Sequence, residues 1–388
     1  MHSNLDLLAG AVFTVVQWLV TLRVMRWARR RFSPAGVKVA RAALVIFNVA
    51  LVLCYALSFS RLISQFHLSP HLGLYAGAIG LGYLIAATAI LTLSLAVDAV
   101  KALVLRPGTD PGRRKLLDMA GLALVSSPLA AMGYGFVHRL DFRVREIDVP
   151  LPGLPDGLDG LRLLQLSDIH LSAFLSESEF ARVVDAANEL RAHVALVTGD
   201  LISSRGDPLE GCLRQIARLR SDAGIFGCLG NHERYAGVEQ DTVAAGARVG
   251  VVFLRGRNLG LRFGGGILNL AGVDYQSVYE REHYLAGAER LIVPGSCNVL
   301  LSHNPDVLPV AARQGYNLVL AGHTHGGQVN IEILDRTINP ARFITPFVYG
   351  LYREGKTAGY VTRGIGTIGI PARIGAPPEI SLLRLRKA

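Results

Sequence analysis

Four long apolar segments in the first third of the chain limit its possible folds more than any other feature. Each is nearly free of charge and about as long as the roughly 20 apolar residues that a bilayer-spanning helix needs. They raise the mean hydropathy of the 388 residues to +0.35, which is high for a protein that folds in water. A buried helical bundle is the alternative, but four such segments in succession favour four membrane spans. The segments are Leu7–Met25, Ala42–Phe59, Leu72–Val97 and Leu116–Val137.

The pattern changes at about Pro150, where short apolar runs begin to alternate with polar, helix-like segments. Such alternation predicts an α/β domain, and the Gly- and β-branched-rich last sixty residues predict hairpins that form a second sheet. We therefore expect three parts: an N-terminal four-helix transmembrane region over residues 1–140, a linker over 141–160, and a globular domain over 161–388.

The positive charge of the chain lies beside the apolar segments. Residues 1–150 contain 16 Lys and Arg against 7 Asp and Glu, a balance of +9, whereas residues 151–388 contain 24 against 23, a balance of +1. A nearly neutral globular part lacks the basic surface of a protein that binds duplex nucleic acid. No protein partner is indicated either. The basic residues that flank the segments are Arg23, Arg26, Arg29, Arg30, Arg31, Lys38 and Arg41, then Lys101, Arg106, Arg113, Arg114 and Lys115.

This distribution predicts an orientation. Under the positive-inside rule, the connections after the first and third segments are cytoplasmic, which places the globular domain outside the cell membrane of a multi-pass protein. The pair Arg113-Arg114 before an apolar run resembles a twin-arginine export signal, and ordinary flanking charge is the alternative. Against this orientation, Arg139, Arg143 and Arg145 follow the fourth segment on the supposed outer side.

Potential metal ligands follow five β-like stretches of the globular part. The carboxyl ends of strands are where ligands collect in open α/β sheets, so we expect one site built from five loops. Two carboxylates, one amide and five imidazoles suit two divalent cations and a catalytic histidine. Five of the eleven histidines belong to this set. The set is Asp168 and His170, Asp200, Asn231 and His232, His303, and His323 and His325.

These ligand types also limit the choice of metal. Carboxylate, amide and imidazole groups together favour Mn²⁺, Fe²⁺ or Zn²⁺ over Ca²⁺ or a metal that prefers thiolates. Asp200 directly follows Gly199 and is placed like a carboxylate that bridges two ions. Two ions about 3.5–4 Å apart can generate a hydroxide and hold both the attacking and the leaving oxygen of a phosphoryl group.

In these blocks the sequence resembles the calcineurin-like metallophosphoesterase superfamily. The resemblance covers roughly residues 160–385 and implies two mixed β-sheets sandwiched between helices. It implies Asp168, His170 and His325 as ligands of one metal, Asn231, His303 and His323 as ligands of the other, and Asp200 as the bridge. His232 would be the general acid, or the charge stabiliser for the leaving oxygen, and Glu233 an orienting neighbour. The matching blocks are Ser167-Asp168-Ile169-His170, Gly199-Asp200, Gly230-Asn231-His232-Glu233, Ser302-His303 and Gly322-His323-Thr324-His325.

The stretches Gly322–Gln328 and Gly364-Ile365-Gly366-Thr367 to Pro377-Pro378-Glu379-Ile380 are similar to a bacterial membrane-associated phosphodiesterase branch of that superfamily. Arg363 and Arg373 lie between them and could meet a phosphate or a polar headgroup, and a surface or supporting position is the alternative. Asp274 and Tyr275 follow a predicted strand and could line the cleft.

The resemblance implies a membrane-anchored dimetal hydrolase that splits P–O bonds by attack of a metal-bound hydroxide. We expect a phosphodiesterase acting on a lipid or envelope-associated phosphoester. A nucleotide-lipid pyrophosphatase, which needs a cytoplasmic site, and a cyclic nucleotide phosphodiesterase are the alternatives. The non-enzyme alternative, a degenerate envelope-binding domain, predicts a lost bridging Asp, a lost Asn or a broken His-x-His pair, and all of these residues are present.

Overall fold

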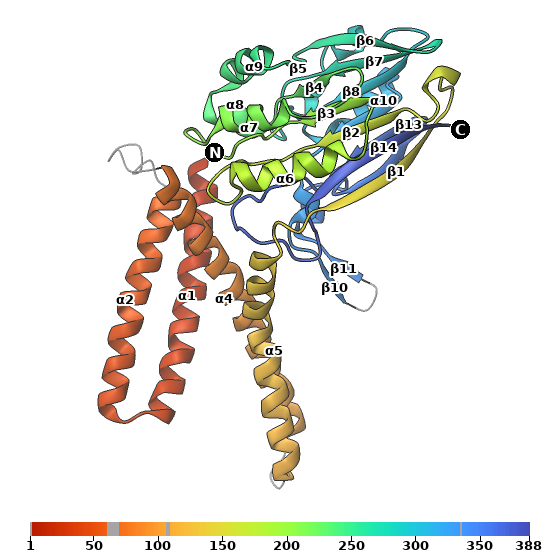
Figure 1. Ribbon diagram of the computed structural model, residues 1–388. Helices are drawn as coiled ribbons and strands as arrows, with labels where there is room; N and C mark the ends of the chain where they lie inside the picture. Colours follow the sequence, from red (N-terminus) through yellow and green to blue (C-terminus); the bar gives the residue numbers. More distant parts are fainter. Residues whose placement is uncertain (1, 60–69, 106–108, 334–335) are drawn as a thin grey trace. The chain divides into compact units, whose positions relative to one another are not determined.

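The computed structural model describes residues 2–59, 70–105, 109–333 and 336–388 (Figure 1). The chain divides into two compact units, Met1–Gly135 and Phe136–Ala388.

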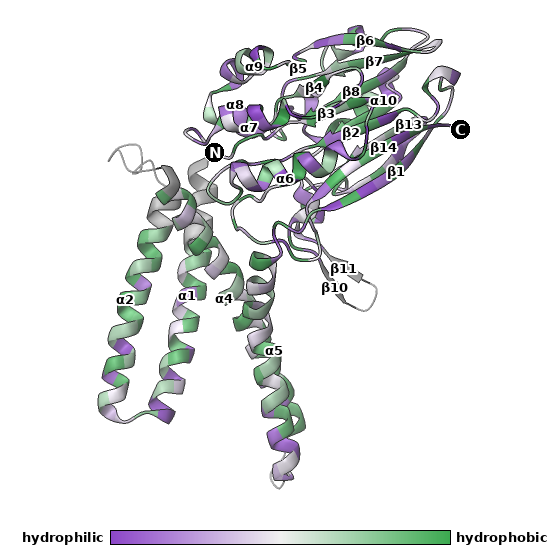
Figure 2. Cartoon of the chain, viewed as in Figure 1, coloured by the Kyte–Doolittle hydropathy of each residue, from purple (hydrophilic) through white to green (hydrophobic). Residues whose placement is uncertain are grey.

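The first unit is built from long helices, and α1, α2 and α4 pack against one another. Three helices of the described residues are long and apolar enough to cross a membrane: Pro34–Cys54, Leu72–Val104 and Pro111–Val137. Figure 2 shows the apolar character of α2, α4 and α5. The helices are α1 (His2–Arg31), α2 (Pro34–Phe59), α4 (Pro70–Val104) and α5 (Pro111–Val137).

Three of the four predicted spans therefore coincide with such helices. The remaining one, Leu7–Met25, lies in α1, which is not among the three candidates in the described part of the chain. Its first residues, 7–10, belong to a segment whose side chains the structure does not describe. The span over Leu7–Met25 therefore stays a prediction.

Polar side chains fix the direction of the packed helices. Gln17 of α1 accepts a hydrogen bond from Tyr83 of α4, and Arg23 of α1 pairs with Asp98 of α4. Because both contacts advance along the two helices in the same sense, α1 and α4 run parallel and their carboxyl ends lie on one side. Lys101 near the end of α4 then pairs with Asp118 near the start of α5 at 2.6 Å.

The second unit contains two six-stranded mixed sheets. The first has the order β1-β14-β2-β3-β4-β5, in which only the β14–β2 pair is antiparallel. The second has the order β12-β13-β9-β8-β7-β6, in which the two outer pairs are antiparallel. The prediction of an α/β domain with two mixed sheets is confirmed. The first-sheet strands are β1 (Arg143–Leu151), β2 (Arg162–Leu166), β3 (Val194–Thr198), β4 (Ile225–Cys228), β5 (Val251–Phe253) and β14 (Glu379–Lys387).

The second sheet and the helices complete this unit, with a small antiparallel hairpin, β10 (Ile331–Ile333) and β11 (Arg336–Ile338), outside both sheets. The second-sheet strands are β6 (Arg257–Phe263), β7 (Gly266–Gly272), β8 (Cys297–Leu301), β9 (Leu318–Ala321), β12 (Gly350–Glu354) and β13 (Thr357–Val361). The helices are α6 (Glu177–Asn188), α7 (Leu209–Ile216), α8 (Asn231–Ala236), α9 (Glu239–Arg248) and α10 (Leu308–Gln314).

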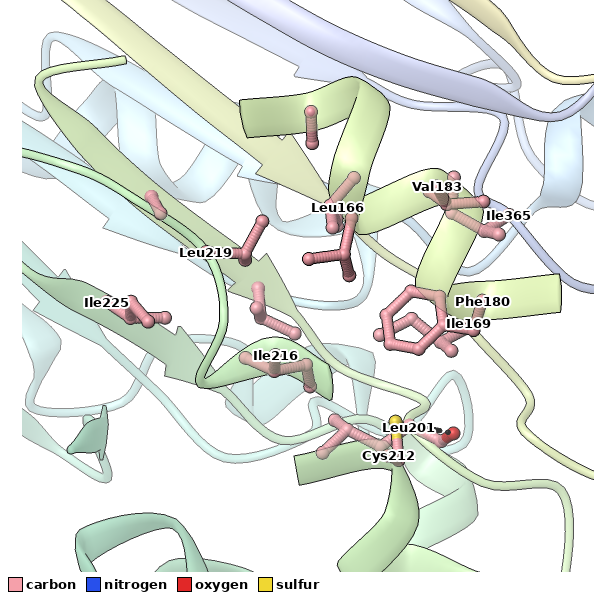
Figure 3. Close-up of a cluster of buried hydrophobic side chains, with 14 of the residues drawn as sticks. Leu166, Ile169, Phe180, Val183, Leu201, Cys212, Ile216, Leu219, Ile225 and Ile365 are labelled. Carbon is pink, nitrogen blue, oxygen red and sulfur yellow. Dashed lines mark hydrogen bonds between the residues drawn. The ribbon is translucent and has the colours of Figure 1, made fainter. Parts of the chain in front are cut away.

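The central strands are apolar on both faces because each face is covered. Leu163 and Leu196 pack between the two sheets, whereas Leu166 packs under α6 and α7. Figure 3 shows this outer core, in which Phe180 of α6 lies beside Leu166. Strands buried on both faces read as continuous apolar runs in the sequence, which is why these strands are predictable.

One strand lies where the sequence predicts a linker. Residues 143–151, inside the predicted linker 141–160, form β1 and pair in parallel with β14 along nine positions. β14 consequently joins the first sheet, so the expectation that the last sixty residues build a second sheet holds only for β12 and β13. One proline, Pro150, and several charged residues in β1 make the strand hard to predict, and both are typical of an edge strand.

Candidate metal centre

Every predicted ligand lies just beyond the carboxyl end of a strand. Asp168 follows β2, Asp200 follows β3, and Asn231 follows β4. The second sheet contributes His303 after β8, and His323 and His325 after β9. Because β2, β3 and β4 are mutually parallel, as are β8 and β9, each sheet brings its ligands to one edge.

The side chains from these loops meet. His303 Nε2 lies 3.0 Å from Asp200 Oδ2, and His325 Nε2 lies 3.4 Å from Asp168 Oδ1. His170 Nε2 lies 3.5 Å from Asp200 Oδ2. Among the described residues, three sets have ligand atoms within 4.8 Å of one another: Asp168, His170 and His325; His170, Asp200 and His232; and Asp200, His303 and His323.

The backbone at this centre is in a conformation that most residues avoid. In the described chain, eight non-glycine residues have positive φ, and five of them are predicted ligands. Outside glycine, the left-handed region is uncommon and costs energy, and such residues cluster at functional sites. The five are Asp168, His170, Asp200, His323 and His325, with φ between 49° and 75°.

Two glycines leave room for the carboxylates. A Cβ on Gly230 would lie 2.1 Å from Asp200 Oδ1, and one on Gly322 would lie 2.2 Å from Asp168 Oδ2. Real Cβ atoms do not approach other atoms so closely, so any larger residue would displace a carboxylate. The glycines that precede Asn231 and His323 in the sequence are therefore required by packing.

The donor set fits divalent cations. In the described chain, Asp168 Oδ2, His170 Nε2 and Asn231 Oδ1 are buried without a hydrogen-bond partner, which is costly unless another group binds them. The opposite ring nitrogens are held: His303 Nδ1 lies 2.6 Å from the Thr198 carbonyl, and His170 Nδ1 lies 3.2 Å from Ser203 Oγ. Such contacts turn Nε2 of each ring towards the centre, as in metal-binding histidines.

The pKa values of the ligand side chains also favour the binding of a cation. Burial lowers the pKa of His170 to about 3 and that of His323 to about 4, so both rings are neutral, as a metal ligand must be. Burial raises the pKa of Asp168 to about 6. At His303 burial opposes protonation, but the neighbouring Asp200 carboxylate outweighs it and the pKa rises to about 10. The Asp200 carboxylate thus stabilises positive charge beside it, as a metal ligand does.

His232 and Glu233 occupy the loop that begins α8. The His232 backbone N–H donates to Asp200 Oδ1 at 2.9 Å, and its Nδ1 lies 2.5 Å from the Ser203 carbonyl. Glu233 is completely buried and accepts three backbone N–H bonds, from Gly230 at 2.7 Å, Leu201 at 2.7 Å and Asp200 at 3.0 Å. Glu233 therefore joins the loop after β3 to the loop after β4.

The two arginines lie behind the centre. Arg373 is only 2% exposed and donates to the carbonyls of His325, Arg363, Gly366 and Ala376. With its donors used in this way, its geometry favours the supporting position over contact with a phosphate. Arg363 is partly buried, and its guanidinium lies 4.3 Å above the ring of Tyr349.

An aromatic wall stands next to the imidazoles. The Tyr275 ring lies 5.6 Å from that of His323, and Tyr235 lies 6.4 Å from Tyr275 and 5.8 Å from His232. Tyr275 also lines a pocket of about 130 Å³ with Arg234 and Asp274. Sequence reasoning pointed to Asp274 and Tyr275 but missed Tyr235, Arg234 and Ser203. For Tyr235 and Arg234, adjacency to His232 is the only available signal.

Residues 161–327 match the family model described as calcineurin-like phosphoesterase. The chain is 31% identical over 281 residues to a Danio rerio protein named transmembrane protein with metallophosphoesterase domain, covering 69% of this chain and 62% of the relative. It is 31% identical to a metallophosphoesterase of Campylobacter jejuni, covering 63% of each. It is 30% identical to the metallophosphoesterase YkuE of Bacillus subtilis, covering 71% of this chain and 97% of the relative.

Two facing mixed sheets with carboxylates, an amide and imidazoles at their strand ends define a candidate metalloprotein of the α/β class. The chain belongs to the calcineurin-like metallophosphoesterases, and the predicted superfamily is confirmed. It spans 62% and 63% of the length of the Danio rerio and Campylobacter jejuni relatives.

Proposed function

We propose that this chain is a membrane-anchored, metal-dependent phosphoester hydrolase with two divalent cations, Mn, Fe or Zn, in its centre. The observation that carries the proposal is the convergence of ligand side chains from the loops that follow five strands, several of which have a buried atom without a hydrogen-bond partner or a backbone at positive φ. Asp168, His170 and His325 would hold one cation, Asn231, His303 and His323 the other, and Asp200 would bridge them.

When bound, the two cations would activate a water molecule and neutralise charge on the phosphoryl oxygens. His232 supplies the proton for the leaving oxygen. Its Nδ1–H donates to the Ser203 carbonyl, which leaves the Nε2–H of the protonated ring for the leaving group. Glu233 keeps the backbone of Asp200 in place and so sets the position of the bridging carboxylate.

The test is hydrolysis of bis(p-nitrophenyl) phosphate by the full-length protein in detergent, with and without Mn²⁺. We expect His232→Ala to lower kcat by roughly 10²–10⁴-fold, the usual contribution of a general acid. Asp200→Asn should lower both kcat and the metal content measured by mass spectrometry. Activity that survives Asp200→Asn in the absence of metal would refute the proposal.

The matched controls are His283→Ala and Asp241→Asn. Both residues are exposed and lie outside the centre, in the loop after β7 and in α9. Each control removes the same kind of side chain as its test variant, so we expect kcat within twofold of wild type for both.

For the substrate, we propose a phosphodiester on a lipid or in the cell envelope. The apolar helices of the first unit and the name of the Danio rerio relative support a site that works beside a membrane. A panel of a phospholipid, a nucleotide-lipid pyrophosphate and a cyclic nucleotide tests this. Preference for either nucleotide substrate by more than tenfold in kcat/KM would refute the lipid assignment.

We also propose that the second unit, Phe136–Ala388, is extracytoplasmic. Because it contains the candidate metal centre, we call it the catalytic unit. The carboxyl ends of α1 and α4, which carry Arg29–Arg31 and Lys101, lie on one side of the helical unit, and α5 starts there with Arg113 and Arg114. If that basic side is cytoplasmic, α5 leads the chain out. A phosphatase or fluorescent reporter fused after Ala388 should give the extracytoplasmic signal, and a cytoplasmic signal would revive the nucleotide-lipid substrate.

A further inference from the structure

We propose that the exposed pair Phe343–Ile344 docks on a lipid bilayer. This contact would attach the catalytic unit to the membrane in addition to the apolar helices of the first unit. Phe343 is 90% exposed, the largest fraction of any exposed large hydrophobic residue in the described chain, and Ile344 is 69% exposed. Single apolar residues on a surface need no explanation. Two adjacent ones at one apex, with the exposed Arg342 beside them, form an apolar tip that no part of the described chain covers.

The tip is held in a defined shape. Asn339 begins the turn, because its Oδ1 accepts the Ala341 N–H at 2.9 Å. The N–H groups of Ile344 and Thr345 both donate to the Ala341 carbonyl at 3.0 Å. The Thr345 hydroxyl donates to Asp306 beneath the tip. A turn fixed in this way presents Phe343 without an ordering cost on binding.

The short connection between α5 and β1 is the reason to expect a bilayer at the apolar tip. α5 ends at Val137 and β1 begins at Arg143, so five residues separate a candidate span from the first strand of the catalytic unit. Five extended residues reach at most roughly 18 Å, which keeps the unit close to the lipid. An apolar tip with an adjacent cation has the composition of interfacial anchors, in which apolar groups enter the acyl boundary and cations meet anionic headgroups.

The tip is also connected to the metal centre. Asn339 Nδ2 donates to the Gly326 carbonyl at 2.9 Å, and Gly326 is adjacent to His325. Further along, the Thr324 hydroxyl donates to the Val348 carbonyl. Docking would therefore hold the loop of His323 and His325 near headgroup depth. This consequence rests on the proposed function, and it means that a phosphoester carried at the headgroup of a lipid is favoured over one in solution.

The test places a single fluorophore on the tip of the full-length protein. The only tryptophans are Trp18 and Trp27, so Phe343→Trp is made in a Trp18→Phe, Trp27→Phe background. The protein is reconstituted in phosphatidylcholine–phosphatidylglycerol vesicles with and without brominated phosphatidylcholine. The matched control is Leu259→Trp in β6, which lies at the opposite edge of the second sheet from β12, the strand that follows the tip.

We expect brominated lipid to quench the tip tryptophan at least twofold more than the control. Equal quenching at the two positions would overturn the proposal. A blue-shifted tip tryptophan that brominated lipid does not quench would also overturn it, because a protein contact would then cover the tip.

A kinetic measurement separates docking from catalysis. The double variant Phe343→Ser, Ile344→Ser should hydrolyse soluble bis(p-nitrophenyl) phosphate within twofold of wild type. With a p-nitrophenyl ester of phosphatidic acid in vesicles, its KM should rise at least tenfold with kcat retained, because two apolar groups that stabilise docking are lost. An unchanged KM would refute the substrate consequence. If wild type hydrolyses neither ester, the proposed function fails, and the quenching result still decides docking.

Discussion

The sharpest prediction concerns Glu233, whose two carboxylate oxygens satisfy three backbone N–H groups in a site that water does not reach. In Glu233→Ala the N–H groups of Gly230, Asp200 and Leu201 lose their acceptors. Each buried donor left unsatisfied costs about 1–3 kcal/mol, so the free energy of unfolding should fall by roughly 3–9 kcal/mol. In Glu233→Gln, the amide oxygen can serve the two donors on Oε2, and the amide nitrogen then faces the Leu201 N–H, for a loss of about 1–3 kcal/mol.

The assay is urea unfolding of the full-length protein in detergent, in which a brief protease pulse digests the unfolded catalytic unit. With a slope of about 3 kcal/mol per molar urea, a loss of 4 kcal/mol lowers the midpoint by roughly 1 M. Glu210→Gln is the control, because Glu210 is exposed and pairs only with Arg248 at 3.2 Å. If Glu233→Ala unfolds within 0.3 M of this control, Glu233 does not hold the two loops together.

Three further predictions use the same preparation. Arg373→Met should lower the free energy of unfolding by roughly 3–5 kcal/mol, because several buried carbonyls lose a charged donor, and a loss below about 1 kcal/mol would contradict that role. Phe180→Ala should cost about 3–5 kcal/mol by opening a cavity under α6, against less than about 0.5 kcal/mol for the exposed Val249→Ala. Removing metal with EDTA should lower the unfolding temperature, and Mn²⁺ at 100 times its Kd should restore about 2.7 kcal/mol. Asp200→Ala should abolish that response, and an equal response in this variant would refute the bridging role.

The catalytic unit was predictable where the sequence carries a local signal. β2, β3, β4, β8 and β9 are short apolar runs because they are buried on both faces, and polar residues appear as soon as each strand ends. The convergence of five loops then follows from the parallel order of these strands. The prediction that Asp168 and His325 belong to one centre could therefore be made without knowing the distance between them.

Other features have no local signal. β1 pairs with β14, which lies more than 200 residues later in the chain, and the charged residues of β1 are also typical of a linker. The sequence leaves Arg373 open between contact with a phosphate or headgroup and a supporting position, because its burial against the carbonyls of His325 and Ala376 depends on how distant loops pack. The positive φ of the ligands is equally hidden, because Asp and His carry no backbone preference as strong as that of glycine.

The pairing of β1 with β14 has a consequence for how the protein is made. Among the described strands, β14 is the only one that pairs with β1 in the first sheet, and it comes more than 200 residues later in the chain. During synthesis, β1 therefore has no sheet partner until residues 379–387 have left the ribosome. The sheet whose strands precede Asp168, Asp200 and Asn231 cannot be completed strand by strand as the chain emerges.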